Sequence, residues 1–510
     1  MTRPALTSAG ALAREIRLLA APGEDGVPLY RRLYRQLRAH ILSGHLPPGA
    51  RLPAARTFAA DLRVSRNTVE AAIAQLVTEG FVERRVGAGS VVSSSAREVA
   101  PFADAARRAP AARGAIRLAG RASLSARGED ILRLGRREWA RDPEFGPCAT
   151  NVTRFPLQAW NRMLARRARR AGADLLVPAD ARGLEELRTA IAEHASLTRG
   201  LRCSSDQVLI VGSSQEALDL AARLVLDPGD TALVEDPGYS GARSAFVSAG
   251  AQLRTVAVDD EGIVTRDLPR SGARLVYVTP SHQFPLGATM SLARRMALLR
   301  WAAAQDAVVI EDDYDSEFRF GGQPLAALQS LPGGDRVLYV GTFNKVLFPG
   351  LRLAYLVLPE PWLEPFAAAR RVTSGSCSPL LQSVLAEFIS SGQFASYLRQ
   401  ARQFYGRCRD RLVEGIEREW GSGVQLGPSN TGLHLTVRVA DDVDDVALAR
   451  RARAAGLPAA SLSGCSIART PPRGLLLNYG SSDPERLATA ARRFAPALLA
   501  ATRRRRAAAR

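Results

Sequence analysis

The sequence predicts an α/β fold for most of the chain, preceded by a small unit that is mainly helical. From about residue 129 onward, short runs of β-branched and other apolar residues alternate with helical periodicity. That alternation is typical of a largely parallel sheet covered by helices. Residues 28–92 instead show three helical patterns followed by two short strand-like segments. A chain of 510 residues with 46% hydrophobic content is long enough for more than one domain with a sizeable core.

The composition is strongly basic, with 69 Lys plus Arg against 50 Asp plus Glu and a net charge of +19. This charge predicts an anionic partner such as nucleic acid. The sequence shows no apolar run of about 18 residues and no compact apolar region of a secretory signal, so we expect a cytoplasmic protein. The five cysteines include no C-x-x-C pair, which argues against a disulfide framework and against a metal site.

The helices of the N-terminal unit follow from apolar spacing and turn residues. The first, amphipathic helix is predicted by Leu29, Leu33, Leu37 and Ile41. A short helix is expected at about 54–62, and Ser65 is a suitable N-cap for a third helix that reaches Glu79. Strands at 81–85 and 90–92 around Gly87-Ala-Gly89 predict a β-hairpin wing.

This unit resembles the GntR-type winged helix-turn-helix in its PLY start and in the segments LPPGARLP, VSRNTV and EGF. The resemblance implies binding to double-stranded DNA, with the second helix of the motif in the major groove. It implies DNA contacts from Arg56, Arg66, Asn67, Thr68 and Arg85. Two residues depart from the family pattern: Ala54 replaces a usual Ser, and Arg63 replaces the usual Gly of the turn.

The strands of the large region each precede a polar cluster. They are predicted at 208–211, 231–234, 275–278, 307–310 and 337–340. Ligands of parallel sheets bind at the carboxyl ends of the strands, so we expect a binding site there.

Lys345, in the segment Val340-Gly-Thr-Phe-Asn-Lys345, is the only lysine of the chain. Arginine can replace lysine in ion pairs and at phosphates, but it cannot form a Schiff base. A retained primary amine therefore indicates the attachment of an aldehyde cofactor such as pyridoxal 5'-phosphate (PLP). Coding bias that spared one lysine by accident is the alternative, and the surrounding residues argue against it.

Polar residues after the strands suit the remaining parts of PLP. Asp312 can hold the pyridinium nitrogen, and Tyr314 can bind the phenolic oxygen. Tyr239 can stack on the ring. The phosphate is expected to bind Ser214 and Gln215 at a helix N-terminus, Arg352 through its guanidinium, and the Thr342 hydroxyl.

The motifs EDPGY, TPSHQFP, EDDYDSEFR and GTFNKVLFPGLRL look like those of a fold-type I PLP-dependent aminotransferase domain with a smaller α+β C-terminal part. Behind a GntR-type unit, they resemble the MocR/GabR-type transcriptional regulators. The resemblance implies that Lys345 forms the internal aldimine and that the protein is a head-to-tail homodimer. The expected segments are a flexible N-terminus at 1–26, the winged helix at 27–92, a linker at 93–128, the aminotransferase-like domain at 129–500 and a basic tail at 501–510.

Four segments depart from the aminotransferase pattern. Asn344 replaces the Ser before the lysine, Val177-Pro178 replaces a Tyr-Gly, and Cys148-Ala-Thr-Asn151 replaces a G-x-P-D motif. Leu475-Leu-Leu-Asn478 contains no arginine where aminotransferases bind the substrate carboxylate, and Arg473 is the nearest candidate. Without that arginine, we do not expect efficient transamination.

The sequence thus favours a DNA-binding transcriptional regulator that binds PLP and senses PLP itself or an amine or amino-acid effector through an aldimine. One alternative is a catalytically active aminotransferase that carries a DNA-binding arm. Another is a regulator whose cofactor site has decayed, so that the large domain serves only for dimerisation.

Overall fold

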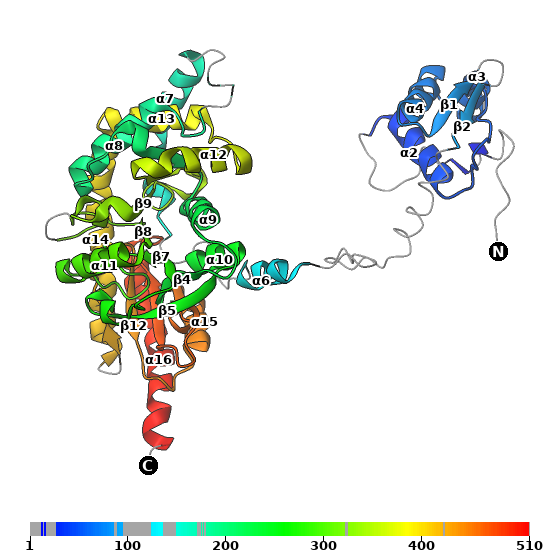
Figure 1. Cartoon of the computed structure of the whole chain (residues 1–510). Helices are drawn as coiled ribbons and strands as arrows, with labels where there is room; N and C mark the ends of the chain where they lie inside the picture. Colours follow the sequence, from blue (N-terminus) through cyan, green and yellow to red (C-terminus); the bar gives the residue numbers. More distant parts are fainter. Residues whose placement is uncertain are drawn as a thin grey trace. The chain divides into compact units, whose positions relative to one another are not determined.

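The computed structural model describes residues 12–13, 15–16, 27–85, 89–94, 124–135, 149–170, 175, 177, 180–321, 325–421 and 424–508. The chain divides into two compact units, Met1–Ser123 and Leu124–Arg510 (Figure 1). No helix among the described residues is long and apolar enough to cross a membrane.

The first unit is the predicted winged helix-turn-helix. It contains α2 (Leu29–Leu42), α3 (Ala55–Leu62), α4 (Arg66–Thr78), β1 (Val82–Arg85) and β2 (Gly89–Val92). The strands pair in antiparallel register, with Val82 opposite Val92. Leu12 and Ile16 also lie in the apolar core of this unit, a contact that the expected flexible N-terminus did not include. The loop at 86–88 and most of the expected linker lie outside the described residues.

The second unit is built on an eight-stranded sheet with the order β3-β10-β9-β8-β7-β4-β5-β6. Its strands are β3 (Val208–Val211), β4 (Thr231–Asp236), β5 (Gln252–Asp259), β6 (Gly262–Ile263), β7 (Ala273–Val278), β8 (Val308–Asp313), β9 (Val337–Thr342) and β10 (Ala354–Val357). Strands β4, β7, β8 and β9 are parallel neighbours, in line with the predicted largely parallel sheet, and β5, which was not predicted, adds a parallel strand beside β4. Strand β10, which the sequence analysis missed, is antiparallel to both β3 and β9.

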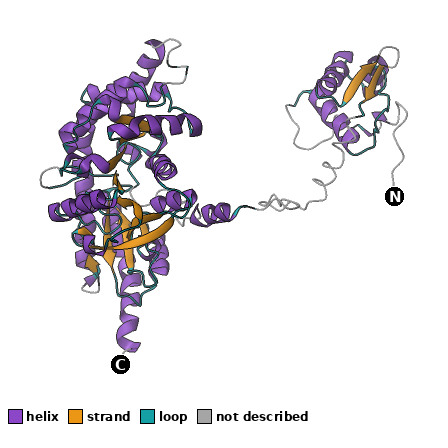
Figure 2. Cartoon of the chain, in the orientation of Figure 1, coloured by secondary structure: helices purple, strands orange, loops and turns teal. Residues whose placement is uncertain are grey.

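Helices surround the large sheet (Figure 2). Alternate residues of its strands pack against different helices. Leu209 and Val211 of β3 pack with α9 (Ser214–Val225), α10 (Ser240–Ala249) and α12 (Leu363–Thr373). Val208 and Ile210 pack with side chains of α7 (Leu157–Arg170), α8 (Glu185–Arg199), α13 (Pro379–Ser390) and α14 (Gln393–Glu419). Helix α11 (Leu292–Gln305) covers part of β7 and β8. The side-chain period of two therefore produces a sheet buried on both faces.

A smaller antiparallel sheet forms the C-terminal part, as expected, with the order β11-β12-β14-β13. Its strands are β11 (Gln425–Leu426), β12 (His434–Arg438), β13 (Ala459–Ser461) and β14 (Gly474–Asn478), flanked by α15 (Asp445–Ala454) and α16 (Pro484–Ala508). Helix α16 continues through Ala508, so the described part of the expected basic tail is helical. Helix α6 (Ala126–Gly135), at the start of this unit, contacts α10.

Candidate functional site

Lys345 lies in the turn that follows β9, and it is half-buried. The preceding residue, Asn344, fixes this turn. Its Oδ1 accepts the N–H of Leu353 at 2.9 Å, and its Nδ2 donates to the carbonyl of Gly212 at 3.1 Å. Tyr397 donates to the carbonyl of Val346 at 3.0 Å. Asn344 therefore supports the position of Lys345, a role that its departure from the usual Ser did not suggest.

Asp312 lies near the end of β8 and is 4% exposed. Its Oδ2 accepts a hydrogen bond from the Tyr277 hydroxyl at 2.8 Å, whereas its Oδ1 is buried and has no hydrogen-bond partner among the residues that the structure describes. Burial raises the pKa of Asp312 to about 7, and the charge of Lys345 acts in the opposite direction. A buried acceptor without a partner is costly, so Oδ1 fits a donor such as a protonated pyridine nitrogen.

The neighbouring Asp313 is a contrasting case, because all its interactions are made within the protein. Arg199 lies 2.7 Å from its Oδ2, and the hydroxyls of Tyr339 and Ser316 donate to the same oxygen at 2.7 and 2.8 Å. Of the two adjacent carboxylates, Asp312 is therefore the one that can accept a hydrogen bond from a ligand.

Tyr314 follows β8 and donates a 2.9 Å hydrogen bond to the carbonyl of His282. His282 in turn lies 3.0 Å, through its Nδ1, from Oδ1 of Asp315, and both side chains are buried. The sequence analysis quoted the segment that contains His282 but gave the residue no role. The available signal was a histidine in the polar cluster that follows β7.

Tyr239 is half-buried at the N-terminus of α10, and its ring lies 6.5 Å from that of Tyr277. A Cβ on Gly241 would come within 2.3 Å of the Tyr239 ring. This glycine is thus required for the position of the ring, which lies on the same side of β7 and β4 as Tyr277.

The residues proposed to contact the phosphate lie at the edge where β3 and β9 end and β10 begins. Ala354 of β10 is paired with both Val211 and Thr342. Ser214 and Gln215 are the first two residues of α9, so their N–H groups precede the intrahelical hydrogen bonds and are suited to an anion.

Arg352 and Thr342 belong to the same corner. A Cβ on Gly212 would lie 3.7 Å from the backbone oxygen of Arg352, which brings the Arg352 backbone close to the residues that begin α9. The Arg352 side chain is exposed and forms no ion pair with any residue that the structure describes. Thr342 Oγ1 accepts the N–H of Asn344 at 3.2 Å, so its hydroxyl proton can be donated to a ligand.

These groups together fit PLP: an amine at Lys345, an unpartnered acceptor at Asp312, a phenol at Tyr314 and an anion site at the start of α9. The remaining departures are less informative. Val177 is 56% exposed, and Pro178 and Cys148 lie outside the described residues. Arg473 lies before β14, and its guanidinium is 3.2 Å from Asp445, so it already has a carboxylate partner within the protein.

A second candidate surface lies on the winged helix-turn-helix. The Ser65 hydroxyl caps α4 by accepting the N–H of Thr68 at 3.1 Å, and the Thr68 hydroxyl lies 2.8 Å from it. Arg66 and Asn67 follow in the first turn and are exposed, as is Arg56 on α3. The predicted contact residues of the two helices are thus accessible.

Arg84 and Arg85 of the hairpin and Arg51 before α3 add basic residues to this surface, and the sequence analysis named only Arg85 of the three. Arg85 is exposed and lies 3.1 Å from Glu83. Arg84 forms a 2.8 Å ion pair with Glu70 of α4, and Arg51 lines the same hollow as both Arg84 and Arg85. The alternation of side chains along the strand could not indicate the position of Arg84, because its ion pair with Glu70 joins the hairpin to α4.

The two departures in this unit have visible consequences. Ala54 precedes α3 without a side-chain cap. Arg63 ends α3 with a φ of 51°, in the left-handed region that favours glycine. The motif is retained despite the strain.

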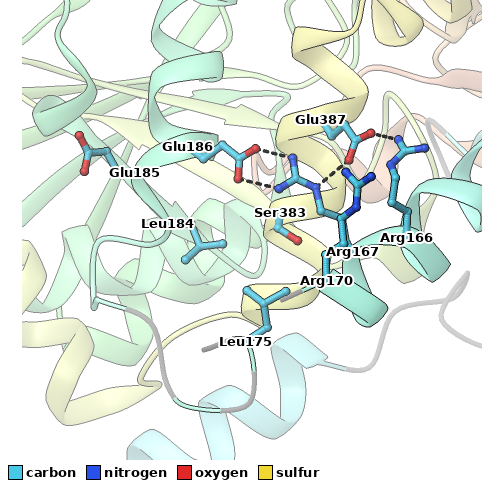
Figure 3. Close-up of a pocket in the computed structure, with 9 residues that line it drawn as sticks. All are labelled: Arg166, Arg167, Arg170, Leu175, Leu184, Glu185, Glu186, Ser383 and Glu387. Atoms are coloured by element: carbon cyan, nitrogen blue, oxygen red, sulfur yellow. Dashed lines mark hydrogen bonds and ion pairs between the residues drawn. The ribbon is translucent and has the colours of Figure 1, made fainter. Parts of the chain in front are cut away.

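Another surface hollow, between α7, α8 and α13, serves packing (Figure 3). Arg166 and Arg167 of α7 both bind Glu387 of α13, and Arg167 also binds Glu186 of α8. The hollow contains none of the proposed cofactor residues, and two of its arginines, Arg166 and Arg167, are paired with these carboxylates.

Two sequence families match this chain. Residues 148–491 match the aminotransferase class I and II family, and residues 29–92 match the bacterial regulatory proteins of the gntR family. The chain is 37% identical over 469 residues to the probable rhizopine catabolism regulatory protein MocR of Rhizobium meliloti. The aligned residues cover 92% of this chain and 93% of that protein. It is 30% identical over 456 residues to the pyridoxine biosynthesis transcriptional regulator PdxR of Corynebacterium glutamicum, covering 89% and 93%.

Solved aminotransferases share the fold of the second unit. The α-aminoadipate aminotransferase LysN of Thermus thermophilus, solved with N-(5'-phosphopyridoxyl)-L-leucine, has a TM-score of 0.65 at 28% identity over 73% of this chain and 97% of LysN. The multiple substrate aminotransferase of Thermococcus profundus also has a TM-score of 0.65, at 24% identity over 75% and 97%.

Proposed function

Because this chain belongs to the MocR-type transcriptional regulators, in which a GntR-family DNA-binding unit precedes an aminotransferase-like domain, we propose that its cofactor site controls its DNA binding. PLP attaches at Lys345, and the occupancy of this site by PLP or by an amine or amino-acid effector sets the affinity for the operator. The observation that carries the proposal is the unpartnered Oδ1 of Asp312 in the same site as Lys345.

The side chains have separate tasks in this proposal. PLP supplies an aldehyde that reacts reversibly with primary amines. Lys345 would provide the protein's own amine, and Asp312 would accept a hydrogen bond from the pyridinium N–H. The Tyr314 hydroxyl would turn from the carbonyl of His282 to donate to the phenolic oxygen. The N-terminus of α9 holds the phosphate with Arg352 and Thr342. An effector amine would compete with Lys345 for the aldehyde, and release of Lys345 would alter the lysine turn, which Asn344 ties to Leu353 and Gly212.

The DNA-binding unit uses the exposed first turn of α4 in the major groove, with Arg56 and Arg85 at phosphates. We also propose a cytoplasmic, head-to-tail homodimer, in line with the family resemblance. A light-scattering mass of twice the 54.8 kDa of one chain tests the dimer.

The primary test compares wild type with Lys345→Ala and Lys345→Arg. Arginine keeps the positive charge but cannot react with the aldehyde, so it is the matched control for charge. We expect PLP to give a visible absorption band with the wild type, and borohydride to attach the PLP permanently to Lys345 in the wild type only. We also expect operator binding to depend on PLP in the wild type and to lose this dependence in both variants. Unchanged cofactor binding and unchanged operator response in Lys345→Ala would overturn the proposal.

A working aminotransferase is the competing function. It predicts steady-state turnover of amino donors with keto acids. The engagement of Arg473 with Asp445 disfavours this function, because a substrate carboxylate would lack that anchor. Sustained turnover in the wild type, lost in Lys345→Arg, would favour it.

A further inference from the structure

A buried apolar cluster borders the residues proposed to bind the cofactor. It is one buried cluster of four side chains: Phe284, Ala460, Cys465 and Leu476. The rings of Tyr239 and Tyr314, both assigned to the cofactor, pack against this cluster. The residues come from the loop after β7 and from the smaller sheet, so the cluster joins the two parts of the domain beside the cofactor. We call it the apolar wall.

The wall occupies the place where a carboxylate-binding arginine was expected. Leu476 is the central residue of β14, in the segment whose lack of arginine the sequence already showed, and it is 1% exposed. Its partners Phe284 and Cys465 are also buried. The structure therefore fills this place with hydrocarbon and leaves it without a charged group.

The arginines beside the wall are already engaged. Arg243 is buried and donates to the carbonyl of Cys465 at 3.0 Å, with Asp236 at 4.0 Å. Arg473 is bound to Asp445 at 3.2 Å. Each guanidinium has an acidic partner within the protein, so recruiting it for a ligand carboxylate would break an existing interaction.

The other charged groups of this region do not supply a substitute. Arg319 and Arg402 line a separate hollow together with Glu317, and that hollow shares no residue with the wall. The His434 ring lies 5.6 Å from that of Phe284, and burial lowers the pKa of His434 well below its ordinary value, so this imidazole is neutral at pH 7.

Lys345 belongs to the same site as the wall. Lys345 follows β9, which pairs with β8, the strand that carries Asp312. Tyr239, which packs against the wall, lies 6.5 Å from the ring of Tyr277, and the Tyr277 hydroxyl donates to Asp312. A molecule whose amino group replaces Lys345 would therefore have to direct the rest of its structure past Tyr239, Tyr314 and Phe284.

We propose that the effector is a primary amine with an apolar body and no carboxylate, and that its body lies against the half-buried ring of Tyr239, which packs on Phe284 and Leu476 of the wall. The proposal rests on the function proposed above, because the amine must compete with Lys345. Burying an unpaired carboxylate against hydrocarbon is strongly unfavourable, whereas each buried methylene strengthens binding roughly fourfold.

Matched ligand pairs test this on the full-length protein loaded with PLP. 2-Phenylethylamine and L-phenylalanine differ only in the α-carboxylate, and pentylamine and 5-aminopentanoate differ only in a terminal carboxylate. Binding is followed by the change in absorbance of the bound PLP, which does not require turnover. We expect each amine to bind at least about tenfold more tightly than its carboxylated counterpart, a difference smaller than an unpaired buried charge would produce.

Two variants of the wall are used, so that the test does not depend on the correct folding of either one alone. Leu476→Arg should reverse the preference within each pair by supplying a guanidinium. Leu476→Ala should weaken amine binding about tenfold through lost apolar contact without improving carboxylate binding. Leu292→Arg adds the same charge at a residue that is 64% exposed on α11, and it should leave the preference unchanged.

The possible failures are distinguishable. If PLP does not attach at Lys345, the proposed function itself fails. If PLP attaches and changes operator binding but neither amine alters its absorbance, regulation by PLP stands and the amine effector is overturned. If L-phenylalanine binds wild type as tightly as 2-phenylethylamine, the apolar specificity is overturned while the cofactor site stands.

Discussion

The Tyr277 hydroxyl donates a 2.8 Å hydrogen bond to Oδ2 of Asp312 and leaves Oδ1 of the same buried carboxylate without a partner. The burial of this carboxylate makes the free energy of unfolding depend on pH. The pKa of Asp312 is about 7 in the folded protein against an ordinary value of 3.8. Between these values the folded state binds the proton more tightly, so the free energy of unfolding of the PLP-free protein falls as the pH rises from about 4 to about 7.

Asp312→Asn removes this contribution and the acceptor for the pyridinium. We expect the melting temperature of the PLP-free variant to rise relative to wild type between pH 5 and pH 8, and its PLP affinity to fall at least about tenfold. Calorimetric melting across this pH range measures the first effect, and absorbance titration measures the second. A temperature difference that does not change with pH would show that Asp312 is not the titrating group.

Asn344 supports the lysine turn through two backbone groups, the N–H of Leu353 and the carbonyl of Gly212. Asn344→Ala leaves both without this partner, and we expect a loss of about 1–3 kcal/mol in the free energy of unfolding. Asn344→Ser, with a shorter side chain, should recover only part of it. Urea unfolding of the PLP-free protein measures this, with Asn161→Ala on the exposed face of α7 as the control. Equal stability of Asn344→Ala and wild type would exclude the supporting role.

Arg63 holds a left-handed conformation at the end of α3, with a φ of 51°. Arg63→Gly should stabilise the winged helix by about 1 kcal/mol, because glycine adopts this conformation without steric cost. Arg63→Ala is the matched control, since it removes the same charge but keeps a Cβ. Slower hydrogen exchange in α3 and α4 of the Gly variant alone would confirm strain. Equal protection in the two variants would attribute any effect to charge.

Glu70 of α4 lies 2.8 Å from Arg84 and 3.9 Å from Arg66. Glu70→Gln should release both arginines for phosphates. We expect tighter binding to non-specific DNA and a salt dependence steeper by about one phosphate contact, which fluorescence anisotropy at several salt concentrations can measure. Glu185→Gln, at an exposed residue of α8, makes the same charge change outside this unit and should have no effect. An unchanged slope in Glu70→Gln would place Arg84 away from DNA.

The parts that the sequence predicted well are those with local causes. Helix α2 follows from its apolar spacing, α4 begins at the cap supplied by Ser65, and the lysine turn follows β9. Strand β10 was missed because its sequence, Ala-Tyr-Leu-Val, directly follows the lysine motif and has no turn signal of its own. The apolar wall could not be predicted, because it joins residues that are far apart in the sequence.

Asp315 connects the two parts of the large domain. Its carboxylate faces Nδ1 of His282 at 3.0 Å and accepts the N–H of Leu433, next to β12, at 3.2 Å. In Asp315→Asn, an amide group that donates would face the ring nitrogen. If His282 carries its proton on Nδ1, two donors meet, and we expect a loss of about 1–3 kcal/mol in the free energy of unfolding.

The same variant decides the tautomer of His282. A proton on Nε2 would leave Nδ1 as an acceptor for the new amide, and the stability would then change little. Urea unfolding of Asp315→Asn is compared with Asp306→Asn, a surface residue paired with Arg336, for which a change within about 0.5 kcal/mol is expected. A large loss in the first variant alone would establish that Asp315 orients the ring of His282. The backbone carbonyl of the same residue accepts the Tyr314 hydroxyl. If both variants have the same free energy of unfolding, Asp315 does not hold His282, and it does not position Tyr314 through that residue.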